Sequence, residues 1–246
     1  MLVELVVLAA LALMAAGIVK GVTGIGYSTS ALPLLALTVG LKAGMPLVLL
    51  PSIASNLTVM RAAGDFGATF RRFWPIYLAV LPGLVAGLAI LPRIADVDAG
   101  GVLGLVLAAY ATAMLLRGPW HLPEPWRRSL MLPVGLLTGL VNGLTGSQVM
   151  PLVPYLLSLE LNASTFVQAS NISFTLSSLL MLAGLARIGL LGWAELGLTI
   201  AGIAPALLGV AIGNAIRQRL APETLRKLVL GALLAMGLAL VVKAVG

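Results

Sequence analysis

Long apolar runs are the feature that most constrains how this chain can fold. Four of them occupy residues 2–19, 74–91, 102–116 and 228–242. Each approaches the ~20 consecutive apolar residues that cross a bilayer. Only 9% of the 246 residues are charged, whereas a soluble domain carries about 25%. A water-soluble fold cannot hide so much apolar surface, so the sequence predicts an all-α polytopic membrane protein in a lipid bilayer.

The net charge of +7 does not indicate a nucleic-acid partner. The basic residues are scattered at the ends of apolar runs, where they set the orientation of the spans. The chain contains no cysteine, which excludes disulfides and thiolate metal sites, and we expect no cofactor. The first run lacks a basic start and continues into a glycine-rich stretch, so we interpret it as retained rather than as a signal peptide.

The chain contains an internal repeat. Three positions recur at one constant offset: Gly17 with Gly135, Gly21 with Gly139, and Pro33 with Pro151. The triplet "ASN" also recurs, ending at Asn56 and Asn171. A repeat of this length indicates duplication. The sequence therefore predicts a first repeat (1–116), a cytoplasmic linker (117–128) and a second repeat (129–246).

Loop charges predict the orientation of the two repeats. Arginine and lysine place residues 61–72, 117–128 and 215–227 in the cytoplasm, whereas residues 93–99 and 186–192 are expected outside. The matching loops 61–72 and 186–192 thus lie on opposite sides, and the repeats are predicted to be inverted. Both termini are then outside.

About five transmembrane or half-membrane segments are expected in each half. They are 2–20, 28–41, 43–60, 73–92 and 100–116, then 129–142, 146–159, 162–185, 193–214 and 228–245. The second segment of each half provides only ~21 Å of helix, which is short of the ~30 Å apolar core of a bilayer. These segments are either thin spans or the return arms of re-entrant pairs, and the sequence leaves both open.

Each half contains a glycine-rich break at the point where its first two segments meet. Irregular backbone at membrane depth is tolerated only inside protein or along an aqueous cavity. The spacing of Gly17 with Gly21, and of Gly135 with Gly139, predicts close helix packing. Further along, a new helix is expected to start in each break. Side chains of Ser28, Thr29 or Ser147 can cap its first turn, or its free N–H groups can bind an anion.

Two such helix starts are expected to hold one small anion near the middle of the membrane. The candidate substrate-binding residues are Lys20, Gly24, Gly26, Ser28, Thr29, Ser55, Asn56, Asn142, Gly146, Ser147, Gln148, Ser170 and Asn171. Lys20 either extends to an interface or provides a cationic ligand. The two asparagines either join helices or line the cavity. Alanine at Gly26 or Gly146 is expected to be poorly tolerated, because a methyl group would crowd the backbone.

The duplicated motifs resemble the sulfite exporter TauE/SafE family, also called toluene sulfonate uptake permeases. The resemblance rests on "GVTGIGYSTSALPLL" and "GLVNGLTGSQVMPLV", on "GDFGATFRRFWPIYLAVLPGLVAG" and "ARIGLLGWAELGLTIAGIAPALLG", and on "LAPETLRKLVLGALLAMGLAL". It extends over nearly the whole chain. It implies a secondary transporter or exporter of sulfite, sulfonates or related anions in the cytoplasmic (inner) membrane of a prokaryote, working by alternating access.

Other functions are less compatible with the sequence. An intramembrane serine protease needs a histidine near its serine, but the only histidine, His121, lies in the linker, so we do not expect an enzyme. An anion channel stays open as an alternative. Glu4, Glu160 and Glu195 lie near predicted segment ends, so the sequence offers no obvious carboxylate for a proton relay. The anion itself, the direction of transport, the coupling ion and a homodimeric assembly also stay open.

Overall fold

The structure, a computed structural model, describes residues 2–116, 121–217 and 222–246, and every regular element within them is a helix. The first half contains α1 (Leu2–Thr23), α2 (Tyr27–Thr38), α3 (Leu41–Ala63), α4 (Phe66–Ile90), the short 3₁₀ helix η1 (Leu91–Arg93) and α5 (Asp96–Leu116). Helix α6 (Glu124–Ser129) belongs to the linker. The second half contains α7 (Met131–Thr145), α8 (Leu152–Leu157), α9 (Ala163–Arg187), α10 (Trp193–Ala201), α11 (Ile203–Arg217) and α12 (Pro222–Val245).

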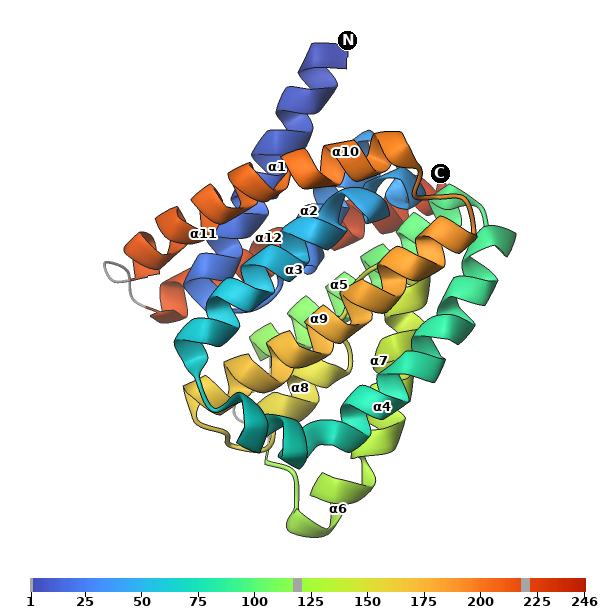
Figure 1. Ribbon diagram of the computed structural model, residues 1–246. Helices are drawn as coiled ribbons and strands as arrows, with labels where there is room; N and C mark the ends of the chain where they lie inside the picture. Colours follow the sequence, from blue (N-terminus) through green and yellow to red (C-terminus); the bar gives the residue numbers. More distant parts are fainter. Residues whose placement is uncertain (1, 117–120, 218–221) are drawn as a thin grey trace.

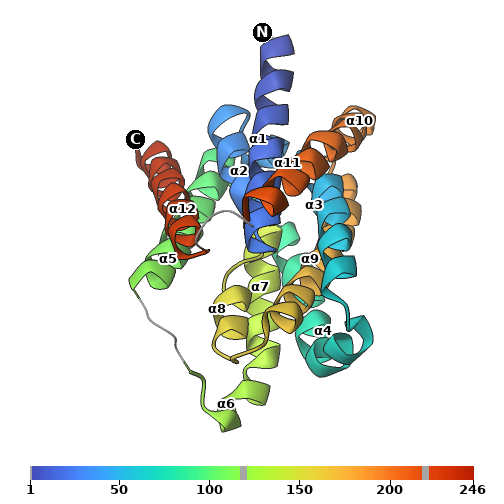
Figure 2. The ribbon, with the colours of Figure 1, turned by 90° about the vertical axis from the view of Figure 1, so that its left-hand side faces the viewer.

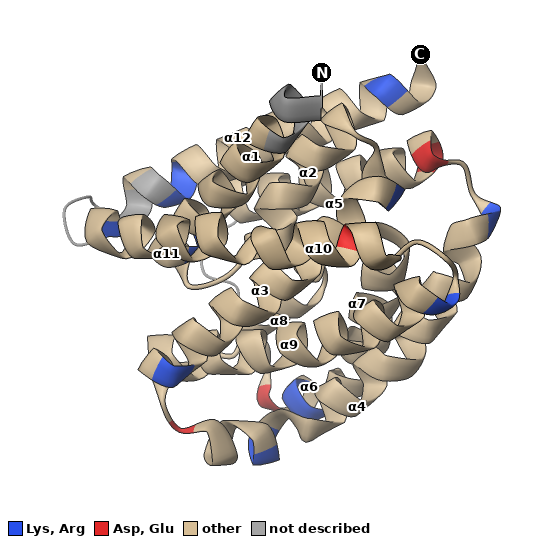
Figure 3. Cartoon of the chain, turned by 45° about the horizontal axis from the view of Figure 1, so that its top comes forward, with Lys and Arg blue, Asp and Glu red and all other residues tan. Residues whose placement is uncertain are grey.

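These helices confirm the predicted fold class. Within the described residues, six helical stretches are long and apolar enough to cross a membrane: Leu41–Ala63, Phe66–Arg93, Asp96–Leu116, Ala163–Arg187, Trp193–Arg217 and Arg226–Val245. Most charged residues lie near helix ends, and the helix bodies are almost free of them (Figure 3). The chain is a multi-pass membrane protein, and the backbone breaks at both glycine-rich stretches as predicted.

The two halves of the chain interleave instead of forming separate bodies (Figures 1 and 2). Helix α1 packs along α11, and α7 packs along α4. In the same way α3 pairs with α9, and α5 pairs with α12. Each of these pairs joins one helix of the first half to one of the second, so each half depends on the other for burial of its apolar faces.

Glycine allows two of these pairs to approach closely. A Cβ added to Gly17 or Gly21 would lie 2.3 Å from a carbonyl oxygen of α11, at Ala206 and Val210 respectively. A Cβ added to Gly139 would lie 2.1 Å from the carbonyl oxygen of Val80 in α4. Such distances leave no room for a side chain. The predicted packing role of these glycines is therefore confirmed.

One end of the helix bundle is marked by Asp96 and is called the Asp96 end. The carboxylate of Asp96 accepts hydrogen bonds from the backbone N–H groups of Leu41 and Lys42, at 3.2 and 2.7 Å. The ammonium of Lys243, near the end of α12, donates to the carbonyl oxygen of Leu37 at 3.4 Å. The turn between α2 and α3, the start of α5 and the end of α12 thus lie together.

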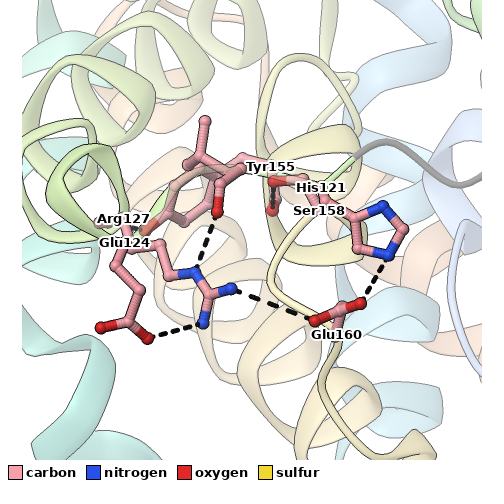
Figure 4. Close-up of polar contacts among 7 residues, drawn as sticks. His121, Glu124, Arg127, Tyr155, Ser158 and Glu160 are labelled. Atoms are coloured by element: carbon pink, nitrogen blue, oxygen red, sulfur yellow. Dashed lines mark hydrogen bonds and ion pairs between the residues drawn. The ribbon is translucent and has the colours of Figure 1, made fainter.

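The opposite end contains the linker and is called the linker end. The N–H of Leu122 donates to the carbonyl oxygen of Ser158 at 3.1 Å, and His121 Nε2 lies 2.5 Å from a carboxylate oxygen of Glu160 (Figure 4). The hydroxyl of Ser164, at the start of α9, donates to the carbonyl oxygen of Ala63 at 2.5 Å. The linker, the loop between α8 and α9, and the end of α3 therefore share this end.

Arg127 organises the linker end. Its guanidinium donates to the carbonyl oxygen of Leu122 at 3.0 Å and approaches Glu124 at 3.3 Å and Glu160 at 4.0 Å (Figure 4). The hydroxyl of Tyr155 in α8 donates to the carbonyl oxygen of Arg127. These contacts hold the linker against α8 and the loop that follows it.

The second helix of each half returns to the end of the bundle where the first helix begins, and each such pair is called a re-entrant pair. Helix α1 runs parallel to α11, with Leu13 beside Gly202 and Gly21 beside Gly213, so α1 starts at the Asp96 end, to which α2 returns. Helix α7 starts at the linker end, to which α8 returns by way of Ser158. The two pairs thus start from opposite ends of the helix bundle, an arrangement that inverted repeats require.

Gly139→Ala should destabilise the protein, whereas Gly231→Ala should not. A methyl group at position 139 must displace α4, and overpacking typically costs about 1–3 kcal/mol. Gly231 is helical too, but no heavy atom lies within 4 Å of its added Cβ. Thermal unfolding of the two purified variants measures the difference, and equal melting temperatures would contradict the close packing of α4 on α7.

The linker end is predicted to face the cytoplasm. Because the chain has no cysteine, single cysteines can be introduced at Asp98 and Ala186 near the Asp96 end, and at Asp65 and Glu124 near the linker end. A membrane-impermeant thiol reagent added to intact cells should label the first two, and the last two only after permeabilisation. Labelling of Asp65→Cys and Ala186→Cys from the same side would exclude this orientation.

Candidate functional site

Lys20 occupies the centre of a polar cluster inside the helix bundle. It lies in the last turn of α1 and its side chain is 0% exposed. Its ammonium donates to the side-chain oxygen of Asn56 in α3 and, at 2.6 Å, to that of Asn171 in α9. The alternative that Lys20 extends to a membrane interface is therefore wrong. One cation links three helices through two neutral amides.

The break after α1 brings Lys20 and Asn171 together. Gly24 and Gly26 adopt φ angles of 78° and 82°, which other residues rarely adopt, and they end α1 and start α2. The irregular turn exposes the carbonyl oxygen of Gly24, which accepts a hydrogen bond from Asn171 Nδ2 at 2.9 Å. The backbone break is thus fixed by the same asparagine that binds Lys20.

Asn56 and Asn171 are equivalent in the repeat but not in the structure. Asn171 Nδ2 donates to two carbonyl oxygens, those of Gly24 and, at 2.7 Å, Val167. Asn56 Nδ2 is buried and has no hydrogen-bond partner among the described residues. A buried amide without a partner carries a free-energy penalty of about 1–3 kcal/mol. Asn171 is therefore fully bonded, whereas Asn56 retains a free donor.

Asn56 lines a small cavity beside Lys20. Gly26, Ser28, Thr29 and Gln148 line it too, so it brings together residues from both glycine-rich stretches. Its volume is about 10 Å³, which has room for about one water molecule. We call this space the Asn56 cavity.

The polar side chains of the two breaks reach neighbouring helices. Ser28 donates to the hydroxyl of Ser52 in α3 at 3.3 Å, and Gln148 Nε2 donates to the hydroxyl of Ser178 in α9 at 3.4 Å. Gln148 Oε1 and the hydroxyl of Ser147 have no hydrogen-bond partner in the described part of the chain. The enzyme alternative gains no support, because Ser147 is buried while His121 lies exposed at the linker end.

Sequence reasoning missed Ser52 and Ser178. Ser52 lies four residues before Asn56 in α3, and residues spaced by four share one face of a helix. The polar face of α9 likewise continues beyond Asn171 to Ser178. Helical periodicity applied to the two "ASN" segments would have found both serines.

Eight of the thirteen candidate residues do not line the Asn56 cavity, among them Ser55, Ser170 and Asn142. The hydroxyls of Ser55 and Ser170 donate, each at 2.9 Å, to the carbonyl oxygens of Ser52 and Phe166 within their own helices. Asn142 is 1% exposed, and neither side-chain polar atom has a hydrogen-bond partner among the described residues. None of the three lines the cavity.

The prediction of two equivalent helix starts is wrong. In the first break α2 begins at Tyr27, and its N-cap residue Gly26 provides no side-chain hydrogen bond. In the second break α8 begins only at Leu152, after Pro151. Residues 147–149 between α7 and α8 are not helical, so no helix starts at Ser147. The expected side-chain caps are therefore not formed, and only α2 starts at the site.

The expected crowding at the two glycines holds for one of them. A Cβ on Gly146 would lie 2.7 Å from Leu32 Cδ1, whereas a Cβ on Gly26 would meet no heavy atom within 4 Å. Gly26 is instead constrained by its left-handed φ angle.

The polar cluster around Lys20 lies off the centre of the helix bundle, because Asn56 is roughly 10 Å of helix from the end of α3 at Ala63. The linker end is thus nearer to the site than the Asp96 end.

The fold and this buried site define a polytopic membrane protein with a polar centre inside its helix bundle. The family model of the sulfite exporter TauE/SafE family matches residues 9–240, and the chain therefore belongs to this family of transporters. A search of curated proteins and a search of solved structures each found no match. The family consists of transporters rather than enzymes, and its substrates are sulfite and related sulfur anions.

Asn56→Ala and Asn171→Ala should have different effects. Asn171→Ala removes the donor that holds the break at Gly24 and should lower the melting temperature, at a cost of roughly 1–3 kcal/mol. Asn56→Ala removes a donor without a partner and should be less destabilising, although Lys20 loses one acceptor in each variant. Thermal unfolding of both purified variants tests this, and a larger loss for Asn56→Ala would contradict the assigned roles.

Proposed function

We propose that the protein is a secondary transporter that binds a small anion, such as sulfite or a sulfonate, at Lys20 and carries it across the cytoplasmic membrane by alternating access. The observation that carries this proposal is the ammonium of Lys20, fully buried between α1, α3 and α9. Ser28, Thr29 and Gln148 are the neighbouring groups proposed to contact the anion.

The charge of Lys20 favours an anionic ligand. Its ammonium donates hydrogen bonds to two neutral amide oxygens, and the ion pairs found within the described residues do not include it. Removing an ammonium from water costs several kcal/mol, which an opposite charge can offset. A bound anion would provide that charge, and the unpaired amide of Asn56 would provide a further donor.

The size of the Asn56 cavity favours a carrier over a channel. A space of about 10 Å³ holds about one water molecule, so a tetrahedral or pyramidal oxyanion cannot enter unless helices move apart. A site that must open to load its ligand fits alternating access. The opposite entry of the two re-entrant pairs supports inverted repeats, which provide two related conformations by exchanging the roles of the halves.

Lys20→Met should weaken anion binding roughly tenfold to a hundredfold and leave the protein folded. The substitution removes the desolvation cost of the buried charge but leaves the side-chain oxygens of Asn56 and Asn171 without a donor, at about 1–3 kcal/mol each. Loss of a charge-assisted hydrogen bond of about 1.5–3 kcal/mol weakens binding roughly tenfold to a hundredfold. Binding of sulfite and of small sulfonates to purified protein gives the affinity, and the melting temperature gives the stability.

Thr138 provides the matched control, because it occupies the position of Lys20 in the second repeat. Its side chain is 0% exposed and its hydroxyl has no hydrogen-bond partner in the described chain. Thr138→Val should leave the affinity nearly unchanged. Unaltered binding by a folded Lys20→Met variant would exclude Lys20 as the anion ligand.

A carrier and a channel differ in exchange kinetics. Liposomes that contain the protein and an internal store of unlabelled anion should take up labelled anion faster than proteoliposomes without internal anion. The reason is that a carrier returns its binding site to the outer side faster when internal anion occupies it. The uptake rate should also saturate with concentration. Unsaturable flux that internal anion does not accelerate would favour the channel.

A further inference from the structure

A second cavity lies beside the Lys20 site and has a different chemistry. Its volume is about 330 Å³, and α1, α2, α5, α8 and α12 contribute to its walls. Most of its surface is apolar, as at Val22, Val153 and Leu230. The space is large enough for a molecule of several carbon atoms, in contrast to the Asn56 cavity.

Two arginines line this cavity on its exposed side. Arg217 ends α11 and Arg226 belongs to the first turns of α12, and both are exposed. Arg226 Nη2 donates to the carbonyl oxygen of Met114 at 2.7 Å, which uses one of the five N–H donors of a guanidinium. Among the described residues that line the cavity, none is acidic. Two positive charges thus adjoin an apolar space at the linker end.

The cavity meets the Lys20 site but is distinct from it. Gly26 and Thr29 line both this space and the Asn56 cavity. Neither Lys20 nor Asn56 lines the larger cavity. The start of α2 therefore forms a shared wall between two chemically different spaces.

We propose that the larger cavity is a second anion site, which binds an amphipathic anion with one acidic group on an apolar body. The acidic group pairs with Arg226 and Arg217, since guanidinium matches the oxygens of carboxylates and sulfonates. The apolar body packs against Val22, Val153 and Leu230. A bare oxyanion is disfavoured there, because it would exchange water for apolar walls. A neutral apolar molecule would leave the arginines unused.

Binding of 1-naphthalenesulfonate tests this site. Titration calorimetry with full-length protein in nanodiscs of zwitterionic lipid, corrected with empty nanodiscs, gives its affinity. Methanesulfonate, which lacks the apolar body, and naphthalenesulfonamide, which lacks the charge, should each bind at least about tenfold more weakly, in line with the loss of ~1.4 kcal/mol or more. Equal affinity for all three would overturn the proposal.

Substitutions on the two sides of the cavity locate the bound probe. Arg226→Ala should weaken its binding about tenfold to a hundredfold, and Val229→Phe should weaken it by filling space from α12. Arg187→Ala, at the Asp96 end, should have no effect and controls for the loss of an exposed arginine. If folded Arg226→Ala and Val229→Phe both bind the probe like the wild type, the site is not there.

Lys20→Met separates this proposal from the proposed function. It should weaken sulfite binding roughly tenfold to a hundredfold. The affinity for naphthalenesulfonate should stay within about twofold, well below a tenfold effect of ~1.4 kcal/mol. Loss of both ligands would show that the naphthalenesulfonate occupies the Lys20 site and would overturn the second site alone. Retention of both would refute the proposed function and leave the second site standing.

The amphipathic anion can come from the membrane or from solution, and two further measurements distinguish the sources. Competition by decanoate for the bound probe, without probe flux in liposomes, supports the second site and assigns it to fatty-acid-like anions of the bilayer. Probe flux that Arg226→Ala abolishes supports it as an entry site for a transported organic anion. If decanoate does not compete and no flux occurs, the assigned ligand class is wrong.

Discussion

The ammonium of Lys20 is the group on which the central architecture depends. A buried positive charge must be hydrogen-bonded, and the acceptors are Asn56 of α3 and Asn171 of α9. Asn171 in turn donates to the carbonyl oxygen of Gly24, so the cation, the amide and the broken backbone form one continuous network. Helices α1, α3 and α9 are therefore fixed relative to one another by polar contacts that the surrounding apolar packing alone cannot specify. The hydrogen bond from Lys20 to Asn171 joins the two halves, whereas that to Asn56 lies within the first half.

Glycine makes this arrangement possible at the level of helix packing. Lys20 reaches the interior because Gly17 and Gly21 allow α1 to lie directly against α11, and Gly135 and Gly139 do the same for α7 against α4. In lipid, close packing of small residues replaces the hydrophobic effect as the force between helices. Because every principal pair joins the two halves, movement of one half cannot occur without sliding along these glycine surfaces. Interleaving thus couples the site to the whole bundle.

Much of this fold could be predicted from the sequence, because membrane thickness and helix rise fix the length of apolar segments. Glycines four residues apart predicted the close helix pairs, and the irregular stretches predicted the breaks. The details of the site depended on what lies opposite each residue, which no local pattern encodes. Asn56 and Asn171 are identical in their repeats, yet only Asn171 faces an open carbonyl. Pro33 lies inside α2, whereas Pro151 immediately precedes α8 as its N-cap residue. The same spacing from glycine to proline, present in both repeats, therefore gives two different backbone paths.

The two repeats differ at the position of Lys20, and this difference bears directly on the site. Both repeats retain an asparagine in their third segment, but the position of Lys20 is Thr138 in the second half, and both side chains are fully buried. A second lysine there would place another ammonium inside the bundle, at a further desolvation cost of several kcal/mol. A single lysine provides one cation for two asparagines, and Lys20 takes an acceptor from each half. The asymmetry thus gives the duplicated chain one central charge instead of two, which matches the single anion of the proposed function.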